Sequence, residues 1–140
     1  MEMFISGACH CGSIKYQAAV NPEQVIICHC EDCQQLSGSA FRTVVMSKEV
    51  TFIQGTPKEY IKIAESGNRR AQGFCGDCGS ALYATSVDHP SINTTKVYGL
   101  RVGTIKEKNQ LTPKVHIWCR SAQAWLKQMP TMKMFDCGPN

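Results

Sequence analysis

The chain has 140 residues, of which 43% are apolar and 19% are charged, and its formal net charge is +4. This length suits one domain that buries its own core, and the composition excludes a disordered chain. No apolar run reaches the roughly 18 residues that cross a bilayer, and the first residues lack the basic start and apolar stretch of a secretion signal. We therefore expect a single domain over residues 1–140 in the cytoplasm, with no membrane partner.

Short strands separated by turn residues are predicted along most of the chain. Apolar and polar residues partly alternate over residues 13–20, as is typical of a half-buried strand. Further strand-like runs, each bounded by Gly, Pro, Asn or Ser, lie at 24–27, 40–46, 50–54, 58–63, 71–74, 96–102 and 115–118. Short helices are expected at 31–36 and 121–128, and the longest predicted loop covers 86–95. The pattern predicts a mainly β fold with few short helices.

Seven of the nine cysteines lie in three short motifs. The motifs are Cys9-His10-Cys11, Cys28-His29-Cys30-Glu31-Asp32-Cys33 and Cys75-Gly76-Asp77-Cys78. Because the total is odd and a cytoplasmic chain is kept reduced, the spacing favours zinc ligation over disulfides. Seven thiolates add seven negative charges and two Zn²⁺ add four positive charges, so the net charge of +4 falls to about +1. A nucleic-acid partner is therefore not expected.

The first and third motifs together predict a closed metal site. Cys75 and Cys78 have the C-x-x-C spacing of a knuckle, whose turn points both sulfurs at one centre about 2.3 Å from each. Cys9 and Cys11 are the natural complement. Zinc bound by four thiolates has no vacant position, which suits a structural role.

The middle motif differs because Cys28, Cys30 and Cys33 offer only three thiolates. A vacant fourth position is typical of catalytic zinc, and a thiol that enters it is held as a reactive thiolate. Two alternatives stay open. His29 or a distant residue could close the site, or the chain could hold one structural metal while its other cysteines are buried thiols.

Other conspicuous residues receive structural interpretations. Free thiols are expected at Cys119 and Cys137, core positions at Trp118 and Trp125, and solvated surface at Arg69 and Arg70. His116 alternates with apolar neighbours and is interpreted as partly buried. The apolar residues of the tail, 129–140, are expected to pack on the chain's own core.

The motifs and their neighbours resemble the family of glutathione-dependent formaldehyde-activating enzymes and the related domain of centromere protein V. The resemblance is carried by residues 7–12 with Ile14 and Tyr16, 28–33 with Ser37 and Gly38, 74–79, 102–105, 113–116 and Trp125. It implies a β-tent fold of small antiparallel sheets held by a structural zinc on Cys9, Cys11, Cys75 and Cys78. It also implies a second, reactive zinc on Cys28, Cys30 and Cys33.

The same resemblance implies a carbon-sulfur lyase that adds the thiol of glutathione to formaldehyde to give S-hydroxymethylglutathione. We therefore predict a zinc-dependent lyase with two zinc sites, the second more labile, acting on a small thiol or its aldehyde adduct. Gln34 and Gln35 stand where many relatives carry a basic residue that could meet a substrate carboxylate. The alternative is a non-enzymatic zinc-binding scaffold, or a thiol- or zinc-sensing module, with the same fold.

Overall fold

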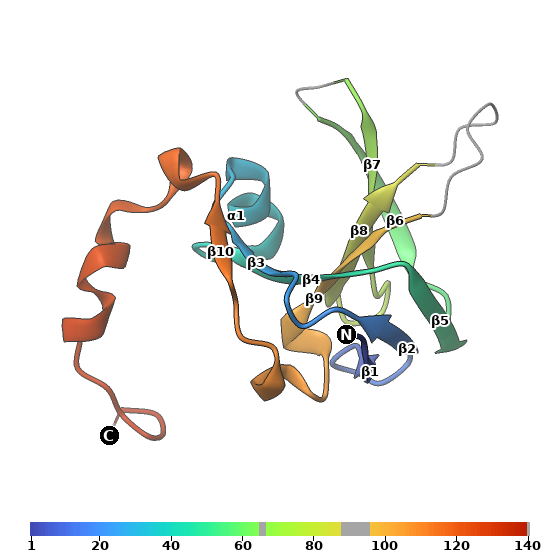
Figure 1. Cartoon of the computed structure of the whole chain (residues 1–140), viewed down its shortest axis with the longest axis horizontal. Coiled ribbons are helices and arrows are strands. Elements are labelled where there is room, and N and C mark those ends of the chain that lie inside the picture. Colours follow the sequence, from blue (N-terminus) through green and yellow to red (C-terminus); the bar gives the residue numbers. More distant parts are fainter. Residues whose placement is uncertain (65–66, 88–95, 140) are drawn as a thin grey trace.

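The computed structural model describes residues 1–64, 67–87 and 96–139 and arranges their strands in two sheets (Figure 1). The smaller sheet has the order β1 (Met3–Ala8), β2 (Lys15–Val20), β5 (Glu49–Gln54). The larger sheet has the order β10 (Val115–Ile117), β3 (Val25–Cys28), β4 (Arg42–Ser47), β9 (Tyr98–Arg101), β8 (Ala81–Ser86), β7 (Arg69–Phe74), β6 (Lys58–Ile63). Neighbouring strands run antiparallel, and β10 joins β3 in parallel.

One short α-helix, α1 (Glu31–Ser37), follows β3 directly. The Sγ atom of Cys30 caps its first turn by accepting from the backbone N–H of Cys33 at 3.2 Å. The helix ends at Gly38, whose φ of 65° is the left-handed conformation that glycine adopts most easily. Four 3-10 helices lie nearer the C-terminus: η1 (Val102–Thr104), η2 (Lys108–Gln110), η3 (Cys119–Ser121) and η4 (Ala124–Thr131).

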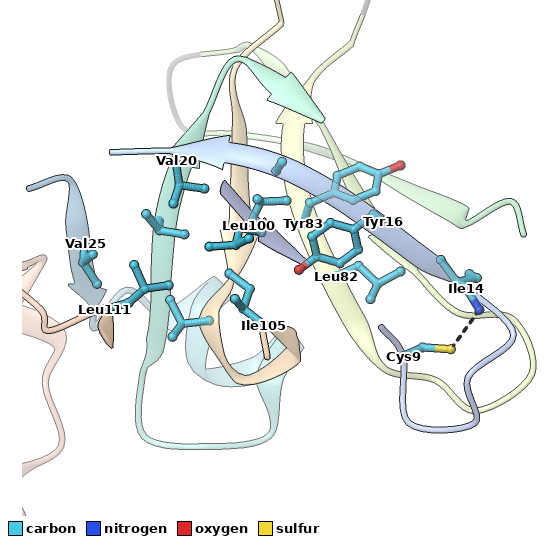
Figure 2. Packing of buried hydrophobic residues seen from close by; sticks show 14 of the residues in the cluster. Cys9, Ile14, Tyr16, Val20, Val25, Leu82, Tyr83, Leu100, Ile105 and Leu111 are labelled. Atoms are coloured by element: carbon cyan, nitrogen blue, oxygen red, sulfur yellow. Dashed lines mark hydrogen bonds between the residues drawn. The ribbon is translucent and has the colours of Figure 1, made fainter. Parts of the chain in front are cut away.

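The core lies between the smaller sheet and one face of the larger sheet (Figure 2). Tyr16 from β2 and Tyr83 from β8 both pack on the ring of Phe52, with ring centroids 5.9 and 5.7 Å apart. Leu82 and Leu100 are fully buried beside them. Each buried side chain of this size stabilises the fold by about 1.5–3 kcal/mol, so the two sheets hold one another mainly through this layer.

Two glycines let the tyrosine rings lie flat against the neighbouring strand. Gly7 is opposite Tyr16 in the β1–β2 pair, and Gly73 is opposite Tyr83 in the β7–β8 pair. A Cβ atom added at either glycine would lie 2.2 Å from the tyrosine ring. Both positions therefore require glycine for lack of space.

The predicted mainly β class with antiparallel sheets is confirmed, and most predicted strands are present. β1 and β8 were not predicted, and the helix expected at 121–128 is divided between η3 and η4. Of the predicted loop, residues 88–95 lie outside the described residues. Among the described residues, no helix is long and apolar enough to span a membrane.

Two predictions about the C-terminal region were wrong. Trp118 and Trp125 are 46% and 39% exposed rather than core residues, and residues 129–139 are exposed rather than packed on the core. Apolar composition had suggested burial, but this segment extends away from the body of the molecule (Figure 1).

We predict that Gly7→Ala and Gly73→Ala each lower the free energy of unfolding by roughly 1–3 kcal/mol, because the added methyl group displaces a buried tyrosine ring. Gly103→Ala is the matched control, since a Cβ atom there meets nothing within 4 Å. Denaturant unfolding monitored by circular dichroism measures the three variants. Equal stability of Gly7→Ala and Gly103→Ala would contradict the packing argument.

Candidate metal centres and the adjoining cavity

Four cysteine sulfurs meet where the turn after β1 approaches the turn after β7. Cys9, Cys11, Cys75 and Cys78 place their Sγ atoms within 4.8 Å of one another. Cys9 Sγ lies 3.6 Å from Cys11 Sγ, which lies 3.8 Å from Cys75 Sγ. Tetrahedral zinc with Zn–S bonds of about 2.3 Å would separate its sulfurs by about 3.8 Å. The spacing and the all-sulfur donor set therefore fit zinc.

Backbone N–H groups surround two of these sulfurs. Cys9 Sγ accepts from Ile14 N at 3.2 Å, the hydrogen bond drawn in Figure 2. Cys75 Sγ accepts from Asp77 N at 3.4 Å and from Cys78 N at 3.5 Å. Such donors stabilise the thiolate form, which is the form that binds metal.

Serine hydroxyls complete the surroundings of the four-sulfur cluster. Ser13 Oγ lies 3.1 Å from Cys11 Sγ and 3.3 Å from Cys75 Sγ. Hydrogen bonding from Ser80 lowers the pKa of the Cys78 thiol. The N–H of His10 donates to Ser80 Oγ at 3.0 Å, which joins the two turns directly.

The second cluster is built from one continuous segment. Cys28 ends β3, Cys30 caps α1 and Cys33 lies in the first turn of that helix, and their Sγ atoms are within 4.8 Å of one another. Cys28 is buried, whereas Cys30 and Cys33 are half-buried. A hydrogen bond from Cys33 lowers the pKa of Cys28 to about 6, although burial opposes this. Three sulfurs at this spacing fit a metal that keeps a fourth position free.

His29 is buried beside the second cluster but is not part of it among the described residues. Its Nε2 atom lies 2.9 Å from Nδ1 of His116, and its ring meets Phe41 edge-on at 5.5 Å. Since adjacent side chains on a strand point to opposite faces, His29 turns away from the sulfurs of Cys28 and Cys30. The two histidines join β10 to β3.

The buried residue Arg42 was missed by the sequence analysis. It lies opposite Cys28 in the β3–β4 pair and is only 6% exposed. Its Nη1 atom donates to Gln72 Oε1 at 3.1 Å, an oxygen that also accepts from Arg101 at 3.2 Å. Among the described residues, no carboxylate lies within ion-pair distance of Arg42. Burial lowers the pKa of its guanidinium, and the cysteines of the second cluster, followed by Asp32, oppose this as its anionic neighbours.

A cavity of about 680 Å³ adjoins the second cluster. It is lined by Cys30, Glu31, Asp32, Lys62, Ile63, Ala64, Trp118, Arg120 and Ser121. Lys62 forms an ion pair with Asp32, and the guanidinium of Arg120 lies 4.9 Å from the centre of a Trp118 ring. Two cations, two carboxylates and one sulfur of the second cluster therefore share one space.

Gln34 connects α1 to the segment that follows β10. Its amide group donates to the carbonyl oxygens of His29 at 2.9 Å and Ser121 at 2.8 Å. Its Oε1 atom accepts from Gln123 at 3.0 Å. The amide is thus used within the chain, a role that no local pattern in the sequence indicates.

Comparison with known proteins identifies the family. The family model described as "Glutathione-dependent formaldehyde-activating enzyme" matches residues 4–121. The chain belongs to this family. A crystal structure of a Rhodobacter sphaeroides protein is similar in fold, with a TM-score of 0.57 and 15% identity, over 79% of this chain and 98% of that one. No curated protein matches the chain.

Family membership and the two sulfur clusters fit a zinc-binding enzyme of the glutathione-dependent formaldehyde-activating type. The structure brings the seven motif cysteines together in the groups of four and three that their spacing predicts. Cys119 and Cys137 are exposed and lie in neither group. The roles of the seven as ligands remain predictions.

We predict two zinc ions per chain in the wild type and one in Cys75→Ser. Loss of the ion between the two sheets should lower the free energy of unfolding by at least about 3 kcal/mol. Elemental analysis of dialysed protein and thermal unfolding measure both effects. Cys119→Ser is the matched control and should keep both ions; a Cys75→Ser protein with two ions or wild-type stability would contradict the assignment.

Proposed function

We propose that the chain is a single catalytic domain with one structural and one reactive zinc. The structural ion would be held by Cys9, Cys11, Cys75 and Cys78, and the reactive ion by Cys28, Cys30 and Cys33. Support comes from the sulfur spacing and from the family match. The observation that carries the reactive assignment is that Cys30 lines the cavity of about 680 Å³.

The proposed reaction adds a thiol to an aldehyde. Zinc bound by the three sulfurs would keep the incoming thiol deprotonated and nucleophilic. The sulfur lone pair forms the new C–S bond, the π electrons of the carbonyl group move to oxygen, and that oxygen takes up the proton that the thiol released. The addition is redox-neutral overall, so no oxidant or further cofactor is required.

Lys62 and Arg120 indicate which charge the proposed substrate carries. Both line the cavity together with Glu31 and Asp32, and Lys62 is already paired with Asp32. Arg120 has no carboxylate at ion-pair distance among the described residues, so it favours a thiol that carries a carboxylate, as glutathione does. Lys62 lies in β6 and Arg120 in η3. They provide positive charge near the second cluster, which the neutral side chains of Gln34 and Gln35 do not. Lys62, oriented by Asp32, also favours the negative charge that develops on the carbonyl oxygen.

The role of Trp118 in this proposal is to orient Arg120. Its indole ring lies under the guanidinium and restricts the conformations of a long, otherwise flexible side chain. A restrained cation loses less entropy when it binds a carboxylate.

We predict that Cys30→Ser reduces the addition of glutathione to formaldehyde to the uncatalysed rate while one zinc and the fold remain. The reason is that Cys30 belongs to the local cluster and not to the one between the sheets. NMR exchange measurements of the adduct, compared with a protein-free control, give the rate. Retained catalysis, or loss of the fold together with activity, would contradict this role; a wild type with no rate above background would favour the scaffold alternative.

A second prediction concerns Arg120→Gln. It should raise KM for glutathione about 10- to 100-fold, the cost of losing one charge-assisted hydrogen bond, and leave KM for an uncharged thiol such as 2-mercaptoethanol unchanged. Lys48→Gln, at an exposed position outside the cavity, is the control. Equal effects on both thiols would argue against carboxylate recognition.

A further inference from the structure

The C-terminal residues 112–139 form an arm that joins the larger sheet through β10 and, beyond that strand, leaves the body of the molecule (Figure 1). None of these described residues is buried. The arm nevertheless carries eight large apolar side chains: Val115, Ile117, Trp118, Trp125, Met129, Met132, Met134 and Phe135, which are between 39% and 87% exposed. Its apolar composition is that of a packed segment, but none of the residues that the structure describes covers it.

The summed exposed apolar area of the arm exceeds the largest apolar patch of a typical monomer. With side-chain areas of roughly 150–250 Å² for the large residues, the exposed fractions amount to about 800 Å². Monomeric proteins rarely expose contiguous apolar patches beyond about 300–600 Å². A stable dimer buries about 800 Å² on each partner, so the arm has the area of one side of such an interface.

Charge distinguishes the arm from the rest of the chain. Four of the 15 Lys and Arg residues and one of the 11 Asp and Glu residues lie in the arm, which gives it +3 and leaves +1 for the rest. If seven thiolates and two Zn²⁺ are counted, the rest of the chain changes from +1 to −2. In the proposed zinc-loaded state an arm of +3 would therefore be electrostatically complementary to a body of −2 in another copy of the same chain.

The strand at the base of the arm has a free edge. β10 is the last strand of the larger sheet, where it pairs with β3 on one side. Among the described strands, none pairs with its other side, and proteins usually cover such an edge. A two-fold axis beside β10 would pair it with its symmetry mate and direct each arm towards the partner's body.

We propose that residues 112–139 embrace a second copy of this chain, so that two arms and two β10 strands form a symmetric dimer interface. The exposed area, the opposite charges and the free edge support the same partner. Because the contact is isologous, each arm residue occurs twice in the interface.

Analytical ultracentrifugation of the zinc-loaded chain of 140 residues tests the proposal. The wild type should sediment as a dimer of the 15.5 kDa chain. Met132→Glu combined with Phe135→Glu should raise the dimer dissociation constant at least about hundredfold, since each of two equivalent sites contributes about tenfold. Higher salt should also weaken the wild-type dimer.

Thr51→Glu combined with Thr56→Glu is the control, because it adds the same two charges at exposed positions of the body. Circular dichroism and zinc content must match the wild type in both double variants; if the arm variant fails this check, Met134→Glu alone, at an 87% exposed position, replaces it. A monomeric wild type, as expected if a different protein or a lipid surface covers the arm, would overturn the proposal. So would an arm variant that dimerises as tightly as the control.

Discussion

The approach of the turn after β1 to the turn after β7 is the contact that fixes how the two sheets meet. Four sulfurs lie within 4.8 Å of one another there, and two of them, Cys9 and Cys75, are buried as part of the core. Four neighbouring thiolates repel one another unless a cation lies among them. A metal at this point would join two segments that are distant in sequence, since Cys11 and Cys75 are 64 residues apart.

The three-sulfur cluster has the opposite character. Cys28, Cys30 and Cys33 come from one short segment, so their geometry depends on the end of β3 and the first turn of α1 rather than on the meeting of two sheets. A site that does not hold distant segments together can leave one coordination position free. Under the proposed assignment three thiolates and Zn²⁺ leave a charge of −1, and the buried guanidinium of Arg42 is placed to offset it.

The strands and the cysteine groups could be predicted from the sequence where they depend on the spacing of nearby residues. Alternation of apolar residues predicts most strands, and the C-x-C and C-x-x-C motifs predict which sulfurs come together, because short turns leave few geometries. β8 was missed because its residues are buried on both faces and do not alternate, and β1 because glycine and serine interrupt its apolar pattern. Arg42 and Gln34 were missed for another reason: their partners, Gln72 and Ser121, are distant in sequence, and only the folded chain shows the contacts.

The tail was misinterpreted because composition shows that a segment requires cover without showing which chain provides it. The proposed interface and the proposed cavity are physically connected, since Trp118, Arg120 and Ser121 belong to both the arm and the cavity wall. Contacts from Gln34 and His29 hold this wall on the body, whereas η4 and the residues beyond it remain exposed. Segments with few buried contacts open most easily, so an uncovered arm would let the cavity wall fluctuate. A second copy that covers the arm would thereby also fix Arg120 in the position from which it meets a substrate.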